Sequence, residues 1–281
     1  MIHTTIWVLQ WEEEMEQERK IAFFDIDGTL TSERDGSIPE SAVLAIRKAR
    51  ANGNLLFINT GRCFQNVEER FRSIGFDGYV CGCGTNIYYH DEELLYVHQT
   101  HETVMELLEQ ARKTDVDILF ESRQEVVFDL SRPLHHPDAK RQYYTFRERH
   151  YDMSHVLEAE DYFCDKFVIW YQEEEQLREF RKVSDKLFDC IDRGGTFREF
   201  VPRPYTKATG IQFLLDYFKL PLDRTYGFGD SNNDLPMLSY VANSIVMGNA
   251  EAPELKKMAS YVTANASENG IRQALEHYRF L

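Results

Sequence analysis

The chain has 281 residues, more than most single domains and too few for three, so we expect two domains or one domain with a large insertion. Its formal net charge of −15 argues against broad binding to a nucleic-acid backbone, which needs clustered Lys and Arg side chains. Hydrophobic residues make up 43% and charged residues 28%, a balance typical of soluble globular proteins. No apolar run approaches the ~20 residues of a membrane-spanning helix, so we expect no membrane partner.

The cysteines and the N-terminus favour a cytoplasmic protein. Five scattered cysteines indicate reduced thiols and not a secreted disulfide framework. Residues 1–20 contain a short apolar stretch followed by an acidic run at 12–14, and this is not the pattern of an export signal. Because Met15 precedes a polar lead to the first strand, residues 1–14 are expected to be a dispensable tail or an over-extended start.

The first half of the chain alternates between predicted strands and helices. Residues 21–25 (IAFFD) form an apolar run that ends in an acid, as expected for a strand buried on both faces of a parallel sheet. Apolar positions at helical spacing in 43–49 predict a helix, which Ser37 or Ser41 can cap and Asn52-Gly53 ends. Further along we predict a strand at 55–58, a helix at 63–74 and a strand at 79–80.

The same alternation returns late in the chain, with predicted helices at 207–218, 235–241 and 253–259 and strands at 225–229 and 244–247. The middle differs, because it contains hairpin-like strand pairs at 87–90 with 94–98 and at 118–120 with 126–130, then helices and a strand at 167–171. We therefore predict an α/β fold with a doubly wound, Rossmann-like parallel-sheet core at 19–83 and 201–281. An α+β cap domain is inserted at 84–200, and residues 1–18 form an N-terminal tail.

The strongest functional signal is the segment 25–30 (DIDGTL), which follows the first strand directly. Ligands of open α/β sheets bind at the carboxyl ends of the strands, so both carboxylates are expected where a substrate can reach them. Gly28 allows a sharp turn. A carboxylate that attacks phosphorus forms an acyl phosphate and divides one difficult displacement into two easier ones; Asp25 fits this role. Asp27 can protonate the leaving oxygen and then deprotonate the attacking water.

A second acidic cluster, 229–234 (GDSNND), follows a later predicted strand. Carboxylates that face a phosphate dianion would repel it, so we expect a hard cation with oxygen ligands, and Mg²⁺ is the usual one. Asp230 is the predicted direct ligand, and Asn233 and Asp234 are predicted to support it.

The phosphate itself needs fixed hydrogen-bond donors and positive charge. Thr60-Gly61-Arg62 offers a hydroxyl and backbone N–H groups at the start of a predicted helix, where anions are favoured. Lys207, at the first position of a later predicted helix, can bridge the phosphate and the nucleophile. Arg62 is a supporting candidate for which local packing or pairing is the alternative.

Taken in order, DIDGTL, TGR, Lys207 and GDSNND resemble the motifs of the haloacid dehalogenase (HAD) superfamily. The large cap between the second and third motifs resembles that of its Cof-type phosphatases, and 247–250 (MGNA) is similar to a loop common in that subfamily. The resemblance covers nearly the whole chain after residue 20. One departure is that 81–86 (CGCGTN) replaces the family's usual Asn-Gly near the cap entrance.

The resemblance implies a role for each matching residue. Asp25 is the nucleophile and a metal ligand, Asp27 is the acid–base group with its main-chain carbonyl on the metal, and Asp230 binds the metal. The implied phosphate-binding residues are Thr60, Gly61 and Lys207. The implied supporting residues are Thr29, Arg62, Asn233, Asp234 and Asn249.

The predicted function is magnesium-dependent hydrolysis of a small phosphorylated metabolite, such as a sugar phosphate, through an aspartyl-phosphate intermediate. We expect a monomer or weak homodimer with no nucleic-acid partner. Two alternatives stay open. A phosphomutase would use Asp27 to return the phosphoryl group to another hydroxyl, although mutases with a similar cap tend to interrupt the acidic motif, which is compact here. A non-catalytic binding or regulatory protein would not need Asp25, Asp27, Lys207 and Asp230 together.

Within the predicted cap, the stretch 131–151 carries five Lys or Arg residues and two acids. We expect an exposed arm; a sharper hypothesis is that its basic side chains steer an anionic substrate, and the candidates are Arg132, Lys140, Arg141 and Arg147. His135-His136 is expected to be solvated. Cys81 and Cys83 lack a second ligand pair, so core thiols are expected instead of a zinc site. Hinges for cap closure are predicted at 82–84 and 202–204.

Overall fold

The protein is described from a computed structural model, and the residues that the structure describes are 19–281. The predictions for residues 1–14 and for the tail at 1–18 lie outside the described residues. The described residues form two compact units, which are treated separately: the first comprises residues 19–60, Glu69–Val80 and Gly210–Leu281, and the second comprises Gly61–Glu68 and Cys81–Thr209. The second unit contains the whole predicted cap segment and extends beyond both of its ends, so the exact domain boundaries stay a prediction.

The first unit is built on a parallel sheet. Its strands lie in the order β13–β12–β11–β1–β2–β3, and every neighbouring pair is parallel. β1, β2 and β11 are buried along their whole length, which is why their sequences do not alternate between apolar and charged residues. The strands are β1 (Ile21–Phe24), β2 (Leu55–Asn59), β3 (Gly78–Cys81), β11 (Thr225–Gly229), β12 (Asn243–Val246) and β13 (Tyr261–Val262).

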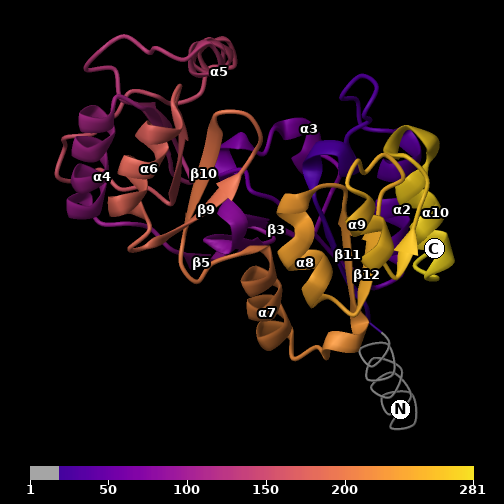
Figure 1. Cartoon of the computed structure of the whole chain (residues 1–281). Helices are drawn as coiled ribbons and strands as arrows, with labels where there is room; N and C mark the ends of the chain where they lie inside the picture. The colour runs from indigo at the N-terminus through magenta and orange to yellow at the C-terminus, as the bar shows by residue number, and fades with distance from the viewer. Residues whose placement is uncertain (1–18) are drawn as a thin grey trace, which may run out of the picture. The chain divides into compact units, whose positions relative to one another are not determined.

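Helices cover both faces of this sheet (Figure 1). On one face, a Cβ added to Gly227 of β11 would lie 3.1 Å from Met237 of α8, so the small residue lets this helix approach closely. On the opposite face, the ring of Tyr226 packs edge-on against Tyr278, which directly follows α10, and α10 in turn packs beside α2. This arrangement confirms the predicted doubly wound α/β fold.

The helices of the first unit are α2 (Glu40–Ala51), α3 (Glu69–Arg72), α8 (Leu235–Tyr240), α9 (Pro253–Met258) and α10 (Gly270–His277), and α7 (Lys207–Phe218) begins in the second unit and continues into the first. Within residues 19–281, no helix has the length and apolar character needed to cross a bilayer.

The strand order of the first unit reverses between β1 and β11. From β1 the chain continues to β2 and β3 on one side, and from β11 it continues to β12 and β13 on the other. β1 and β11 pair in parallel with Phe24 opposite Phe228, so their carboxyl ends lie side by side. In open α/β sheets, ligands bind in the crevice outside such a switch point.

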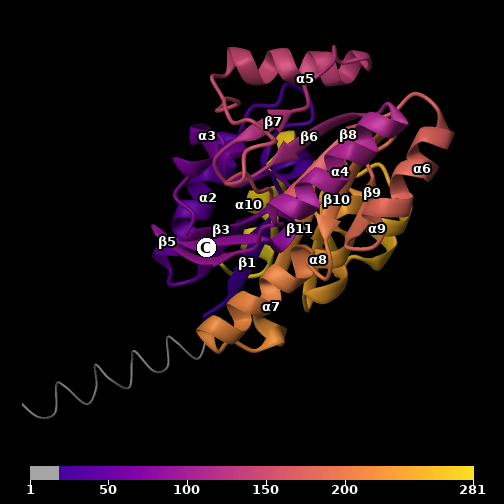
Figure 2. The ribbon, with the colours of Figure 1, turned by 90° about the vertical axis from the view of Figure 1, so that its left-hand side faces the viewer.

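The second unit contains a five-stranded sheet in the order β7–β6–β8–β10–β9, and its neighbouring strands are antiparallel. Helices α4 and α6 pack side by side on one face, as Figure 2 shows, and α5 packs on the other. The elements are β4 (Asn86–Tyr89), β5 (Glu92–Tyr96), α4 (His101–Thr114), β6 (Asp117–Glu121), β7 (Val126–Phe128), α5 (Pro137–Glu148), β8 (Lys166–Trp170), α6 (Glu174–Ser184), β9 (Phe188–Asp192) and β10 (Phe197–Pro202).

Two predictions of local structure are wrong. The helix expected at 63–74 is two short pieces, the 3₁₀ turn η2 (Phe64–Asn66) and α3, because Val67 between them has an extended backbone with ψ of 91°. Helix α2 begins after Pro39 without a side-chain cap, so neither expected serine caps it. The hydroxyl of Ser37 donates to Asp35 instead, over 2.7 Å.

Candidate active site

Three aspartate side chains meet at the switch point of the first unit. Asp25 follows β1, Asp230 follows β11, and Asp234 ends the 3₁₀ turn η5 (Asn232–Asp234). One carboxylate oxygen from each lies within 4.8 Å of those from the other two. Asp25 and Asp234 are buried, and Asp230 is half-buried. Negative charges this close and this poorly hydrated repel one another, so the arrangement favours a bound cation.

The backbone around Asp25 is fixed by the sheet and by a turn. The Asp25 N–H donates to the carbonyl of Phe228 over 3.0 Å, which extends the pairing of β1 with β11. Gly28 has a φ of +77°, and a Cβ there would lie 2.2 Å from Oδ2 of Asp230. Any other residue here would strain the turn and displace the Asp230 carboxylate, so glycine is needed. Asp27, between them, is exposed.

Neighbouring polar groups hold the Asp230 loop in place. Thr29 donates its hydroxyl to Oδ1 of Asp230 over 3.2 Å. The carboxylate of Asp234 accepts the N–H groups of Asp230 and Ser231 at 2.9 and 3.1 Å, and Ser231 donates its hydroxyl to Asn233. Asp234 thus shapes the loop as well as lying among the candidate metal ligands.

Asn249 connects this site to a more distant loop. Its side-chain amide donates to the carbonyl of Gly28 over 2.8 Å, and its Oδ1 accepts the N–H of Ala266 over 3.0 Å. The first unit therefore brings together seven of the residues singled out from the sequence, which are Asp25, Gly28, Thr29, Asp230, Asn233, Asp234 and Asn249.

The predicted phosphate-binding residues are divided between the units. Thr60 is a buried residue of the first unit, and its N–H donates to the carbonyl of Val80 over 2.8 Å. Gly61, Arg62 and Lys207 belong to the second unit, where Lys207 is the buried first residue of α7. Their contacts with a phosphate stay predictions.

Arg62 pairs locally. Its Nη1 lies 3.2 Å from Oε1 of Glu68 and donates to the carbonyl of Asn66 over 3.1 Å. The helix expected to begin just after this residue is only the short turn η2, so the expected helix N-terminus beside Gly61 is absent.

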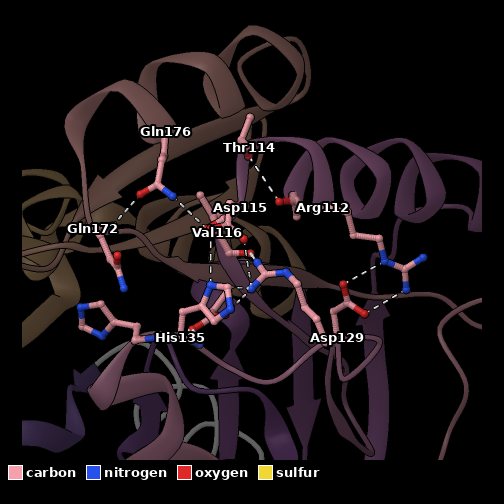
Figure 3. Close-up of polar contacts among 12 residues, drawn as sticks. Arg112, Thr114, Asp115, Val116, Asp129, His135, Gln172 and Gln176 are labelled. Carbon is pink, nitrogen blue, oxygen red and sulfur yellow. Dashed lines mark hydrogen bonds and ion pairs between the residues drawn. The ribbon is translucent and has the colours of Figure 1, made fainter.

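The basic stretch 131–151 is partly neutralised by neighbouring acids. Arg132 lies 3.4 Å from Asp117 and 3.3 Å from Asp115, and His135 lies 3.4 Å from Asp115 (Figure 3). Arg141 pairs with Asp138, the acid at the start of α5. The steering hypothesis stays a prediction, with fewer uncompensated charges than the sequence indicates.

His136 is not solvated as expected. It is half-buried, and its ring accepts the N–H of Asp138 over 3.2 Å, which caps the start of α5. The expectation of core thiols at Cys81 and Cys83 is met, because both are buried and neither is in a disulfide. Burial raises the pKa of Cys83 to about 12, so this thiol is protonated at neutral pH.

Sequence analysis does not single out the charged residues inside the strands of the second unit. Glu121, Lys166 and Glu199 are buried at the ends or middle of β6, β8 and β10. The available signal is a charged residue within an otherwise apolar strand, and this signal does not say which strands are neighbours. Buried charges of this kind persist when they are paired.

Comparisons with known proteins agree with this architecture. Residues 22–275 match a family model described as haloacid dehalogenase-like hydrolase. An HMP-PP phosphatase of Yersinia enterocolitica is 27% identical over 92% of this chain and 95% of its own length. The 5-amino-6-(5-phospho-D-ribitylamino)uracil phosphatase YitU of Bacillus subtilis is 23% identical over 94% of this chain and 99% of its own. The solved structure of the HAD subclass IIB sugar phosphatase BT4131 has a TM-score of 0.77 and 28% identity, covering 93% of this chain and all of that one.

Proposed function

The chain belongs to the haloacid dehalogenase-like hydrolase family and is a phosphatase of that family, and from this premise we propose that it hydrolyses a small phosphorylated metabolite with Asp25 as the nucleophile. The observation that carries the proposal is the convergence of Asp25, Asp230 and Asp234 at the strand-order switch point. A carboxylate in this position has a backbone fixed by the sheet, so little reorganisation is needed for attack.

The proposed reaction has two steps. An oxygen of Asp25 attacks phosphorus, the bond from phosphorus to the leaving oxygen breaks, and Asp27 gives a proton to that oxygen. A water molecule then gives a proton to Asp27 and attacks the phosphorus of the aspartyl phosphate, which releases inorganic phosphate and restores Asp25. Asp27 suits this exchange of protons with substrate and water because its side chain is exposed.

We propose Mg²⁺ as the cofactor. The donor set fits this ion, because it consists of carboxylate oxygens and two of the three side chains are buried. Asp25 and Asp230 would hold the ion, together with the main-chain carbonyl of Asp27, and Asp234 would orient the loop. When bound, the ion offsets the repulsion between these carboxylates and a phosphate dianion.

Thr60, Gly61 and Lys207 are the proposed phosphate-binding residues. A hydroxyl and a backbone N–H supply neutral donors, and a buried ammonium supplies positive charge, which together match the three terminal oxygens of a phosphoryl group. Arg62 is left as a supporting residue because it pairs with Glu68.

The substrate proposal follows from the relatives. Two of them are named for phosphorylated small molecules, and one solved structure is that of a sugar phosphatase. We propose a sugar phosphate or a similar phosphorylated metabolite of the cytoplasm, handled by a monomer or weak homodimer. The five cysteines, none of which is in a disulfide, support that compartment.

The test is a panel of phosphorylated metabolites assayed for phosphate release with Mg²⁺, with EDTA, and with Mg²⁺ restored after chelation. We expect release that is lost in EDTA and recovered on restoration. Activity on the panel that is unchanged by EDTA would contradict the role of the cation. Transfer of phosphate to a second hydroxyl, without release, would identify a phosphomutase instead.

A further inference from the structure

A buried cluster of charges lies within the second unit. The ammonium of Lys166 lies 2.7 Å from Oε1 of Glu199 and 3.2 Å from Oε2 of Glu121. Arg193, in the turn between β9 and β10, donates from Nε to Oε2 of Glu199 over 2.6 Å. Glu199 therefore connects the two cations, and each of its carboxylate oxygens contacts one of them.

Glu199 is charged although it is buried. Its side chain is 3% exposed. Burial opposes ionisation of this carboxyl, but the positive charges of Lys166 and Arg193 overcome that effect and hold its pKa at about 2. Well-packed apolar residues of similar volume are often as stable as a buried ion cluster, or more so. Stability alone is therefore a weak explanation of the cluster, and its contacts with a neighbouring segment indicate another role.

The cluster packs against the backbone of Gly61, in the TGR segment. A Cβ added to Gly61 would lie 2.9 Å from Nη2 of Arg193 and 3.3 Å from Oε1 of Glu199. It would also lie 3.4 Å from Sγ of Cys83, which is itself 4.0 Å from Oε1 of Glu199. All four residues belong to the second unit, so these contacts lie within one compact body. The side of Gly61 that a side chain would occupy is therefore filled by Glu199 and two of its neighbours.

The cluster also lies near Lys207, the other residue of this unit that is proposed to bind the phosphate. Burial and the charge of Glu199 raise the pKa of the Cys83 thiol to about 12. Three cations oppose that rise, and these are Lys166, Arg193 and Lys207. The cations of the cluster and Lys207 are therefore close enough to act on one side chain, and Glu199 supplies negative charge among them.

We propose that Glu199 is a positioning residue that fixes the backbone of Gly61, so that the Gly61 N–H meets a phosphoryl oxygen of the substrate. This inference rests on the proposed function, because it concerns the same phosphate site. Glu199 acts through Arg193 and Cys83, whose side chains it keeps against Gly61, and it is too deeply buried to contact the substrate itself. Fixed donors stabilise an anion better than mobile ones, because no reorganisation is needed when the anion binds.

The experiment measures the Kd of inorganic phosphate by calorimetry, with the full chain and saturating Mg²⁺. Wild type is compared with Glu199→Gln, which removes the negative charge at nearly constant side-chain size. The matched control is Asp129→Asn. Asp129 is a buried carboxylate that accepts two hydrogen bonds of 2.9 Å from Arg112. It follows β7, which β6 and β8 separate from β10 in the sheet, so it tests the loss of a similar ion pair elsewhere in the same unit.

We expect Glu199→Gln to raise the Kd of phosphate by about tenfold, as for one misplaced donor to a charged acceptor. Asp129→Asn should bind phosphate as tightly as wild type. The Kd of Mg²⁺ alone should be the same in all three proteins, because the candidate metal ligands belong to the first unit.

Three results would overturn the inference. They are a Kd of phosphate that is unchanged in Glu199→Gln, an equal rise in Asp129→Asn, and a loss of Mg²⁺ affinity in Glu199→Gln as large as its loss of phosphate affinity. Should Glu199→Gln not fold, Glu199→Asp takes its place. It keeps the charge but is too short to contact Lys166 and Arg193 together, so it should raise the Kd of phosphate by about threefold, and an unchanged Kd would equally refute the positioning role.

A double-mutant cycle tests whether Glu199 acts through Gly61. Gly61→Ala places a methyl group against Arg193 and Glu199, so it should also raise the Kd of phosphate. In the double variant Glu199→Gln/Gly61→Ala both changes disturb the same contact, so the rise should be smaller than the product of the two single rises. Rises that simply multiply would show that the two residues act independently and would contradict the positioning role.

Failure of the proposed function has a different signature, which is a wild type that binds phosphate but hydrolyses no phosphate ester with Mg²⁺. The comparison of Kd values does not depend on turnover, so it decides the inference in that case as well. A wild type with no measurable affinity for phosphate would refute the inference.

Discussion

The backbone conformation of Gly28 leaves room for the carboxylate of Asp230, a candidate metal ligand. Its positive φ is strained for alanine, and a Cβ would collide with the Asp230 carboxylate at 2.2 Å. Gly28→Ala should therefore displace Asp230 and raise the Mg²⁺ concentration needed for half-maximal activity by about tenfold or more. The measurement is phosphate release titrated with Mg²⁺.

Gly36→Ala is the matched control. Gly36 has a similar φ of +69°, but nothing lies within 4 Å of its added Cβ. Both variants should lose about 1 kcal/mol of stability from backbone strain. A Mg²⁺ requirement raised equally in both would show that strain alone, and not the Asp230 contact, is responsible.

Asp165 gives the second unit a stability that depends on pH. Burial raises the pKa of this carboxyl to about 8, from 3.8 for an exposed aspartate, and the nearby Glu121 adds to the rise. The folded state thus keeps a proton that the unfolded state loses. The resulting stabilisation is complete below about pH 4 and is lost as the pH rises to about 8.

Asp165→Asn removes this titration. The free energy of unfolding of wild type relative to the variant should fall by about 1 kcal/mol per pH unit between those limits, measured by urea denaturation across the range. A difference that stays constant with pH would contradict the raised pKa.

At the scale of the elements, Asp234 joins the loop after β11 to η5. Asp234→Ala leaves the N–H groups of Asp230 and Ser231 without their acceptor, which should cost about 1 to 3 kcal/mol of stability and weaken Mg²⁺ binding. Asp234→Asn keeps an oxygen acceptor and should lose less stability. Thermal unfolding with and without Mg²⁺ separates the effect on stability from the effect on Mg²⁺ binding. Equal losses of stability in Asp234→Ala and Asp234→Asn would contradict the role of Asp234 as the acceptor that holds the loop.

The sequence predicts the elements of the core well, because buried parallel strands such as β1 and β2 consist mainly of apolar residues without alternation. The break in the helix predicted at 63–74 is not predictable in this way. It depends on the extended conformation of Val67, a residue whose apolar side chain fits a helical pattern equally well.

The candidate site is predictable in its chemistry and less so in its geometry. Asp25 and Asp230 each follow a strand, so their motifs place both at the carboxyl edge of the sheet. That they are neighbours depends on β1 pairing with β11, which periodicity does not reveal. For the same reason the pairing of Lys166 with Glu199, on adjacent antiparallel strands, is invisible in the linear pattern.

At the scale of the whole molecule, Mg²⁺ binding should increase the stability of the folded chain. Mg²⁺ that binds only the folded chain stabilises it by about 2.7 kcal/mol at a concentration of 100 times the Kd. We expect the Tm to rise with Mg²⁺ in wild type. Asp25→Asn removes one of three mutually repelling carboxylates, so its Tm without metal should be higher than that of wild type and its response to Mg²⁺ smaller.

Asp223→Asn, at the 3₁₀ turn η4 (Leu222–Arg224), is the control for loss of a carboxylate elsewhere in the first unit. It should keep the wild-type response to Mg²⁺. The account of the cluster as a cation site would be contradicted if Asp25→Asn and wild type showed the same rise in Tm.

The residue that carries phosphate during turnover can be identified directly. Wild-type protein is mixed with a substrate found in the metabolite panel, quenched in acid within one turnover, digested and examined by mass spectrometry. We expect a phosphoryl group on the peptide that contains Asp25, localised to its carboxylate and absent without Mg²⁺. A phosphoryl group on another side chain, or substrate consumed with no phosphorylated peptide at any quench time, would contradict it.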